Sequence, residues 1–217
     1  MIDAVSALKR LQEGNSRFVN GLRSVETMMT HAKRATLTEG QEPFAIILGC
    51  SDSRVPAEIV FDQGLGDLFV IRVAGNIVAP SQIGSVEFAA AKFKTRLVVV
   101  LGHSQCGAVS ATVEELKRPD SEQSLNIKSI VERIRPSVEA FKPTELWNDD
   151  VALVEQSMRA NVRASANQLR HGSAILENLS AKEDLLIVGA EYSLETGKVE
   201  FFDGLPELYD CFSATNV

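Results

Sequence analysis

Short apolar runs, separated by longer stretches of mixed polar and apolar residues, form the main pattern of this 217-residue chain. Four of them are rich in Ile, Val and Leu and are bounded by Gly, Pro or charged residues: 44–48, 68–73, 97–101 and 185–188. Runs of this kind are typical of strands buried on both faces of a parallel sheet. A fifth run, 198–202, follows residues 191–194 after the turn 195–197, and we expect this hairpin to add an antiparallel edge strand.

Helical patterns separate the strands. We expect helices in the stretches 84–93, 107–117 and 125–179, the last being a long polar and apolar tract. Alternating β and α elements favour a doubly wound sheet. The predicted fold is therefore a single α/β domain over residues 1–217, with a mostly parallel sheet of four parallel strands plus an antiparallel edge strand, flanked by helices.

The first 36 residues are expected to form an N-terminal helical arm in front of an α/β core over 37–217. Asp3 can cap a helix there. Its apolar residues recur at helical spacing: Val5, Leu8, Leu11 and Phe18. This stripe has little core of its own to cover, so we expect it to pack on a partner subunit. The alternative is that the arm folds back on its own domain.

Composition and charge exclude several classes of protein. A net charge of −7 argues against nucleic acid or an anionic membrane surface as a partner. No apolar run approaches the roughly 20 residues of a membrane span, and charged residues interrupt the first 21 positions, where a signal peptide would need an apolar core. We expect a soluble cytoplasmic enzyme. Its three cysteines should be reduced there, which favours metal binding or thiolate chemistry over a disulfide, with Cys211 as the bystander.

Two segments carry candidate chemistry, Cys50-Ser51-Asp52-Ser53-Arg54 and His103-Ser104-Gln105-Cys106. Each follows a predicted strand and therefore lies at the carboxyl end of the sheet, where crevices form. Two thiolates and an imidazole are the ligand set of a Cys₂His zinc site. Such a set leaves one coordination position for water or substrate, which predicts a catalytic zinc that activates water. Gly102 and Gly107 should let the backbone approach the ion closely.

Asp52 and Arg54 decide how the fourth position is used. If residues 50–54 stay extended, Cys50, Asp52 and Arg54 share one side of the chain. Asp52 could occupy the fourth position itself, or accept the proton of a metal-bound hydroxide. Arg54 could pair with the carboxylate bidentately and hold it off the metal. A closed structural site with Asp52 as fourth ligand, or a mere surface ion pair, stays open as an alternative.

On these two motifs the chain resembles the β-class carbonic anhydrases. The resemblance lies in C-S-D-S-R-V at 50–55, G-H-S-Q-C-G at 102–107 and their separation, and extends over nearly the whole chain. It implies reversible hydration of CO₂ to bicarbonate and a proton by zinc-hydroxide attack. It also implies one Zn²⁺ per chain on Cys50, His103 and Cys106, with Asp52 and Arg54 as the catalytic pair beside the metal-bound water.

The resemblance further implies a substrate site of the plant-like subtype. In that site, substrate would meet the side-chain amide of Gln41, the apolar residues Phe69, Ala74 and Phe88, and the backbone N–H of Gly107. Apolar walls suit a nonpolar gas. For Phe69 and Phe88, ordinary core packing is an equal alternative.

Ile47 stands where the bicarbonate-regulated subtype carries a tryptophan, which favours the plant-like arrangement with water on zinc. The family's basic unit is a dimer with active sites at the interface, so the resemblance implies a homodimer or homotetramer acting on CO₂ and bicarbonate. Two alternatives to carbonic anhydrase activity stay open. One is a hydrolase of carbon disulfide or carbonyl sulfide, and the other is a non-catalytic, zinc-stabilised bicarbonate-binding protein.

Overall fold

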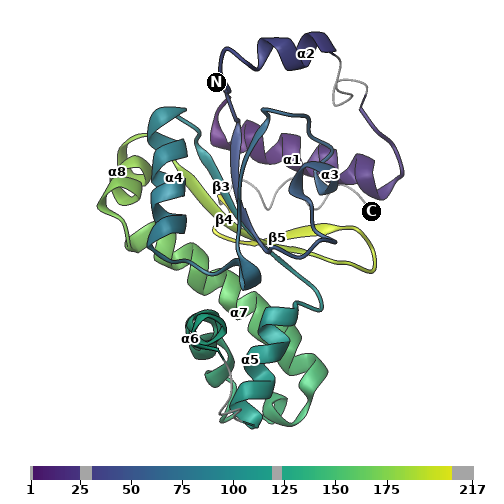
Figure 1. Ribbon diagram of the computed structural model, residues 1–217, viewed down its shortest axis with the longest axis vertical. Coiled ribbons are helices and arrows are strands. Elements are labelled where there is room, and N and C mark those ends of the chain that lie inside the picture. Colours follow the sequence, from purple (N-terminus) through teal and green to yellow (C-terminus); the bar gives the residue numbers. More distant parts are fainter. Residues whose placement is uncertain (1, 25–30, 119–123, 207–217) are drawn as a thin grey trace.

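A five-stranded sheet forms the centre of the computed structural model, which describes residues 2–24, 31–118 and 124–206 (Figure 1). Its strands are β1 Ala45–Gly49, β2 Leu68–Arg72, β3 Leu97–His103, β4 Leu186–Tyr192 and β5 Val199–Asp203. The order is β2-β1-β3-β4-β5, with the first four parallel and β5 antiparallel to β4. The predicted α/β fold, including its antiparallel edge strand, is confirmed.

Helices cover both faces of this sheet. They are α1 Ala4–Val19, α2 His31–Thr36, α3 Ala57–Val60, α4 Pro80–Lys92, α5 Gly107–Lys117, α6 Leu125–Glu139, α7 Asp150–His171 and α8 Ala174–Lys182, with short 3₁₀ turns at Ala74–Asn76 and Glu145–Asn148. The helical tract expected over 125–179 is thus three α-helices joined by short connections. In the described part of the chain, no helix has the length and apolar character needed to cross a membrane.

Alternating side chains of the strands enter two separate cores. Ile46 and Leu48 face the core under α4, α7 and α8, whereas Ala45 and Ile47 face the core under α1 and α3. All five residues of β1 are buried. This double burial explains why the strands read as continuous apolar runs rather than as alternating ones.

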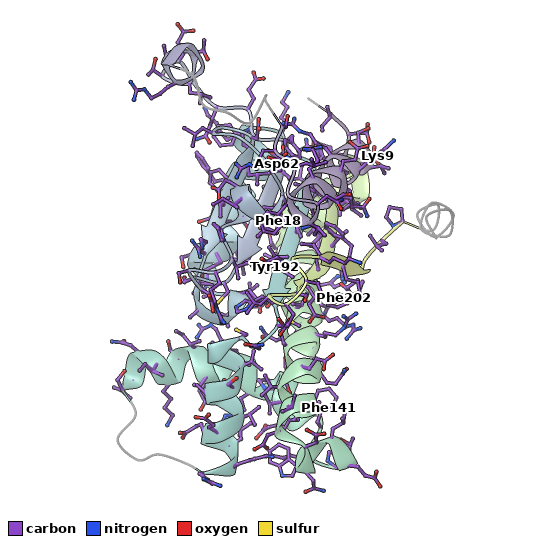
Figure 2. The ribbon with its side chains drawn as sticks, turned by 90° about the vertical axis from the view of Figure 1, so that its right-hand side faces the viewer. Lys9, Phe18, Asp62, Phe141, Tyr192 and Phe202 are labelled. Carbon is purple, nitrogen blue, oxygen red and sulfur yellow. The ribbon has the colours of Figure 1, made fainter. Side chains whose placement is uncertain are left out.

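The apolar stripe of α1 packs on its own sheet, so the expectation that it meets a partner subunit was wrong. Leu8 and Leu11 are fully buried in the core under α1, and the ring centroid of Phe18 lies 6.4 Å from that of Tyr192 (Figure 2). Val5 alone of the stripe is about half exposed. The physical reason is that this face of the sheet is apolar and needs a cover. Asp3 caps the helix as predicted, its Oδ1 accepting from the Ser6 amide at 2.8 Å.

Helices α5 and α6 and the first half of α7 project beyond the carboxyl ends of the parallel strands (Figure 1). Phe141, just after α6, lies in this projecting part (Figure 2). The chain enters the projection directly from β3, where His103 ends the strand and Gly107 begins α5. The second candidate motif therefore lies at the junction of sheet and projection.

Candidate metal centre

The structure brings Cys50, His103 and Cys106 together. Their ligand atoms all lie within 4.8 Å of one another, and all three residues are buried. Cys50 follows β1 and His103 ends β3, and these strands are adjacent and parallel, so their carboxyl ends meet. Cys106 is the N-cap residue of α5. The grouping expected from the two motifs is present.

A tight turn between His103 and Cys106 directs both side chains to the same point. Gln105 adopts a left-handed backbone with φ of 54°. The hairpin between β4 and β5 supports the turn, because Ser104 Oγ and Gln105 Nε2 both donate to the carboxylate of Glu195, at 2.8 and 2.5 Å. These contacts hold a conformation that few residue types adopt freely.

The His103 ring is oriented as a metal ligand. Its Nδ1 lies 2.8 Å from the Ser104 carbonyl oxygen, to which an Nδ1–H can donate. That bond leaves the lone pair on Nε2, which is buried and has no hydrogen-bond partner among the described residues. A buried, orphaned Nε2 beside two sulfurs is the donor set that zinc takes in proteins. The residues present therefore fit a zinc ion.

The cysteine pair provides a negative charge that suits a cation. Hydrogen bonding from the Cys106 thiol lowers the pKa of Cys50 to about 4, against the opposing effect of burial. The same contact, together with burial, raises the pKa of Cys106. Burial alone would lower the pKa of His103, but the Cys50 sulfur outweighs it and raises that pKa. A thiolate at Cys50 is therefore in place at neutral pH, as metal binding requires.

Asp52 lies beside the ligand group and is bound by Arg54. Arg54 donates from Nε to Asp52 Oδ1 at 3.0 Å and from Nη2 to Oδ2 at 2.7 Å. These bonds hold the pKa of Asp52 well below its usual range. Asp52 Oδ2 is 3.9 Å from His103 Nε2, close to the ligands without belonging to their group.

Residues 53–54 form a turn, so the condition that 50–54 stays extended is not met. The Val55 amide donates to the Asp52 carbonyl at 3.1 Å, and the Arg54 amide donates to Asp52 Oδ1 at 2.9 Å. Arg54 therefore reaches Asp52 by folding back, because the side-chain oxygen of Asp52 competes for the backbone donor. Arg72 of β2 fixes this turn by donating to the carbonyls of Cys50 and Asp52, at 3.0 and 2.6 Å.

The two glycines of the second motif differ in what surrounds them. A Cβ at Gly102 would lie 2.5 Å from Val162 Cγ2 and 2.6 Å from Met158 Sδ, so Gly102 is required for the packing of α7 on β3. A Cβ at Gly107 would meet no atom within 4 Å.

The predicted substrate residues fall into two groups. Ala74 begins the 3₁₀ turn whose next residue, Gly75, donates its amide to Cys50 Sγ at 3.4 Å, and Gly107 follows Cys106 directly. Both therefore lie at the ligand group within one chain. Gln41 does not, because it precedes β1 whereas Cys50 follows it, and the strand separates them.

Phe69 and Phe88 form an aromatic cluster with Phe93, with ring centroids 5.6 to 6.3 Å apart. Phe69 pairs with Ile46, four residues before Cys50, which places it roughly 13 Å back along the sheet. Phe88 is 52% exposed, so core packing does not explain it within one chain.

Sequence reasoning assigned no role to Arg72, Glu195 or Gly75 in supporting the ligands. Each forms hydrogen bonds with the loops that carry the ligands, and no sequence motif predicts these bonds. A signal was present for one further residue, since Asn161 is a polar residue on the apolar face of a long helix, where a buried partner is required.

The chain is similar to known carbonic anhydrases. A family model described as carbonic anhydrase matches residues 45–199. A carbonic anhydrase of Mycolicibacterium smegmatis is 39% identical over 204 residues, covering 94% of this chain and 96% of that protein. Carbonic anhydrase 2 of Mycobacterium tuberculosis is 38% identical over 199 residues, covering 92% and 93%. The solved structure of the β-carbonic anhydrase CcaA aligns with a TM-score of 0.71 at 25% identity, covering 93% and 94%.

Proposed function

The chain belongs to the β-class carbonic anhydrase family, and from this membership we infer that it catalyses the reversible hydration of CO₂ to bicarbonate and a proton. The observation that carries the inference is the buried group of Cys50, His103 and Cys106 with the Asp52 carboxylate held beside it by Arg54. The sulfur-substrate hydrolase and the non-catalytic binding protein are not favoured, because the curated relatives described above, at 39% and 38% identity, are named carbonic anhydrases.

We propose one zinc ion per chain, held by Cys50, His103 and Cys106. When bound, zinc supplies a coordinated water whose pKa is lowered toward neutrality, the nucleophile that CO₂ hydration needs. Orientation of the three ligands comes from the chain itself. The Ser104 carbonyl holds the ring of His103, and the Gly75 amide meets the sulfur of Cys50.

We propose that Asp52 orients the nucleophile by accepting its proton in a hydrogen bond, and that Arg54 positions Asp52. The two bonds from Arg54 keep the carboxylate charged, since its pKa is well below the usual range. They also engage both carboxylate oxygens, which supports an open site over one closed by Asp52 as fourth ligand. Arg54 Nη2 lies 3.4 Å from the Gln105 carbonyl oxygen as well, and so links the two ligand loops.

Substrate should approach from the side of Asp52 and Arg54. Arg54 is half exposed there, and its guanidinium can attract bicarbonate. A cleft of about 640 Å³, which Asp52 and Arg54 do not line, is bounded by Ser104 and Gln105 together with the carboxylates of Glu114, Glu155, Glu191 and Glu195. An anion is disfavoured in such a cleft. The Gly107 amide and Ala74 are proposed to contact substrate at the open side.

The other proposed substrate residues require a second subunit. Gln41 lies at the amino end of β1, and the cluster of Phe69 and Phe88 lies back along the sheet from Cys50. Their roles in binding CO₂ are consistent with a site shared between two copies. We therefore propose a homodimer or homotetramer. A cytoplasmic location, expected from charge and cysteine content, stays a prediction.

Stopped-flow CO₂ hydration, measured from about pH 6.5 to about 9 on protein of assayed zinc content, tests the function. We expect fast turnover at one zinc per chain. Cys106→Ser should lose both zinc and activity, whereas the matched variant Cys211→Ser, at a position outside the described residues, should keep both. Absence of turnover in fully zinc-loaded protein would refute the assignment, and assays with carbon disulfide and carbonyl sulfide would then decide between the alternatives.

A further inference from the structure

A stripe of polar side chains runs along the buried face of α7. Ser157, Asn161 and Ser165 recur every four residues and are at most 4% exposed. Buried polar groups cost free energy unless they are hydrogen-bonded, so a polar stripe on a core-facing helix needs a partner. The Ser157 hydroxyl has none among the described residues, whereas the other two bind one and the same segment of the chain.

That segment is the turn at Ala74–Asn76. Asn161 donates from Nδ2 to the Gly75 carbonyl at 2.8 Å, and Ser165 donates from Oγ to the Asn76 carbonyl at 3.1 Å. Gly75 and Asn76 both have left-handed backbones, with φ of 69° and 42°. This conformation is strained for Asn76 and persists only when its surroundings hold it. The two bonds from α7 provide that hold.

The held turn contacts a metal ligand. The Gly75 amide donates to Cys50 Sγ at 3.4 Å, and a Cβ at Gly75 would lie 2.6 Å from Ile134 Cδ1, so the position admits only glycine without rearrangement. Hydrogen bonds to ligand sulfur fix its orientation and reduce its electron density. The same residue therefore presents its N–H to the sulfur and its carbonyl to Asn161.

α7 packs tightly on the sheet next to the other ligands. Val162, the residue after Asn161, packs against two strand glycines, since a Cβ at Gly102 or Gly189 would lie 2.5 or 2.8 Å from its methyl groups. Gly102 directly precedes the ligand His103. One helix thus packs on β3 beside His103 and holds the turn that faces Cys50.

Resting on the proposed function, we propose that Asn161 is a positioning residue of the metal centre. By binding the Gly75 carbonyl it holds the Gly75 amide against the Cys50 sulfur, and so sets the geometry and donor strength of that ligand. It acts from a position 86 residues away from Gly75 in the sequence. It contacts neither metal nor substrate.

Cobalt-substituted protein tests this without any activity assay. Asn161→Leu keeps the number and branching of the side-chain heavy atoms, with a larger volume, but removes the donor. Ser157→Ala is the matched control, because it changes the same stripe one turn away at a hydroxyl without a described partner. The measurements are the thiolate-to-cobalt charge-transfer absorption and the rate of cobalt release to a chelator. We expect Asn161→Leu to shift the absorption and speed release roughly 10-fold or more, as loss of an outer-shell partner does elsewhere, with Ser157→Ala unchanged.

A wild-type absorption and release rate in Asn161→Leu would overturn the proposal, whatever the variant's melting temperature, and leave Asn161 a purely structural residue. If Asn161→Leu does not fold, Ser165→Ala decides: a smaller change in the same direction supports the proposal, and no change overturns it. Failure of the proposed function would look different, because zinc-loaded wild-type protein would then lack CO₂ hydration while the cobalt spectra still separated the variants.

Discussion

Arg54 covers both carboxylate oxygens of Asp52, with Nε 3.0 Å from Oδ1 and Nη2 2.7 Å from Oδ2. A carboxylate engaged in this way stays ionised and has a fixed direction. It also has less freedom to turn and complete the coordination of a metal. We therefore expect this one side-chain pair to decide whether the proposed metal site is open or closed.

Removal of either partner should separate catalysis from metal binding. We expect Asp52→Ala and Arg54→Ala to keep about one zinc per chain but to lower CO₂ hydration by about 10²- to 10⁴-fold, the range for loss of a positioned proton acceptor. Zinc assay and stopped flow on the same samples measure both quantities. Arg133→Ala, on the exposed face of α6, is the control and should hydrate CO₂ normally. Loss of zinc from the Asp52 variant would make Asp52 a structural ligand instead.

Gly102 and Gly107 flank the second motif, and substitution by alanine should lower the stability of the fold at Gly102 but not at Gly107. At Gly102 the new methyl group would overlap Val162 and Met158, which should cost about 1–3 kcal/mol of unfolding free energy. At Gly107 it would meet nothing within 4 Å, and the fold should tolerate it. Urea denaturation of both variants checks this. Equal stability of the two would show that α7 does not pack on Gly102 as described.

Glu195 should stabilise the ligand turn in a pH-dependent way. Hydrogen bonds, led by that from Ser104, lower the pKa of Glu195. Because the folded pKa is the lower one, the stabilisation is present at neutral pH and is lost as the pH falls through the carboxyl range. Glu195→Gln should therefore melt below the wild type at pH 7, and the difference should shrink toward about pH 4. A difference that stays constant between these pH values would assign it to packing rather than charge.

The end of α1 should depend on the buried carboxylate of Asp62. Arg17 Nε lies 2.6 Å and Arg23 Nε 3.3 Å from its oxygens, and the Asp62 side chain is fully buried. Asp62→Asn should lower the free energy of unfolding by about 1–3 kcal/mol, because charged hydrogen bonds are lost from a buried site. Glu13→Gln, which removes an exposed pair with Lys9 on the same helix, should cost less than about 1 kcal/mol. Equal effects in denaturation would argue against an anchored α1.

A shared active site predicts complementation between inactive variants. Gln41→Ala alters only the proposed donor from one copy, and Asp52→Asn alters only the proposed proton acceptor of the other. Mixed and reassembled, the two should regain part of the CO₂ hydration, because each hybrid contains one site with both residues intact. Mixtures that form hybrids but stay inactive would place Gln41 outside the active site.

The strands and the three ligands could be read from the sequence because each has a local signature. Buried runs such as 97–101 are apolar throughout, and the bounds expected for α5 are those observed. Their adjacency followed from the rule that ligands gather at the carboxyl ends of parallel strands.

The rest depended on contacts between distant residues. The stripe of α1 was visible, but periodicity does not say which surface covers it. The turn at Ser53 and Arg54 arises from competition between a side chain and the backbone, and the contact of Asn161 with Gly75 joins two segments that share no motif. The packing role of Gly102 could not be foreseen, because its neighbours Met158 and Val162 belong to another element.

The position of α7 in the chain also orders the events of synthesis. All three ligands have left the ribosome once residue 106 has emerged. The helix that packs on β3 and binds the Gly75 turn, α7, ends only at His171. A nascent chain shorter than this carries every thiolate and imidazole of the site without the scaffold that aligns them. The geometry that would bind a metal tightly is thus complete only late in synthesis.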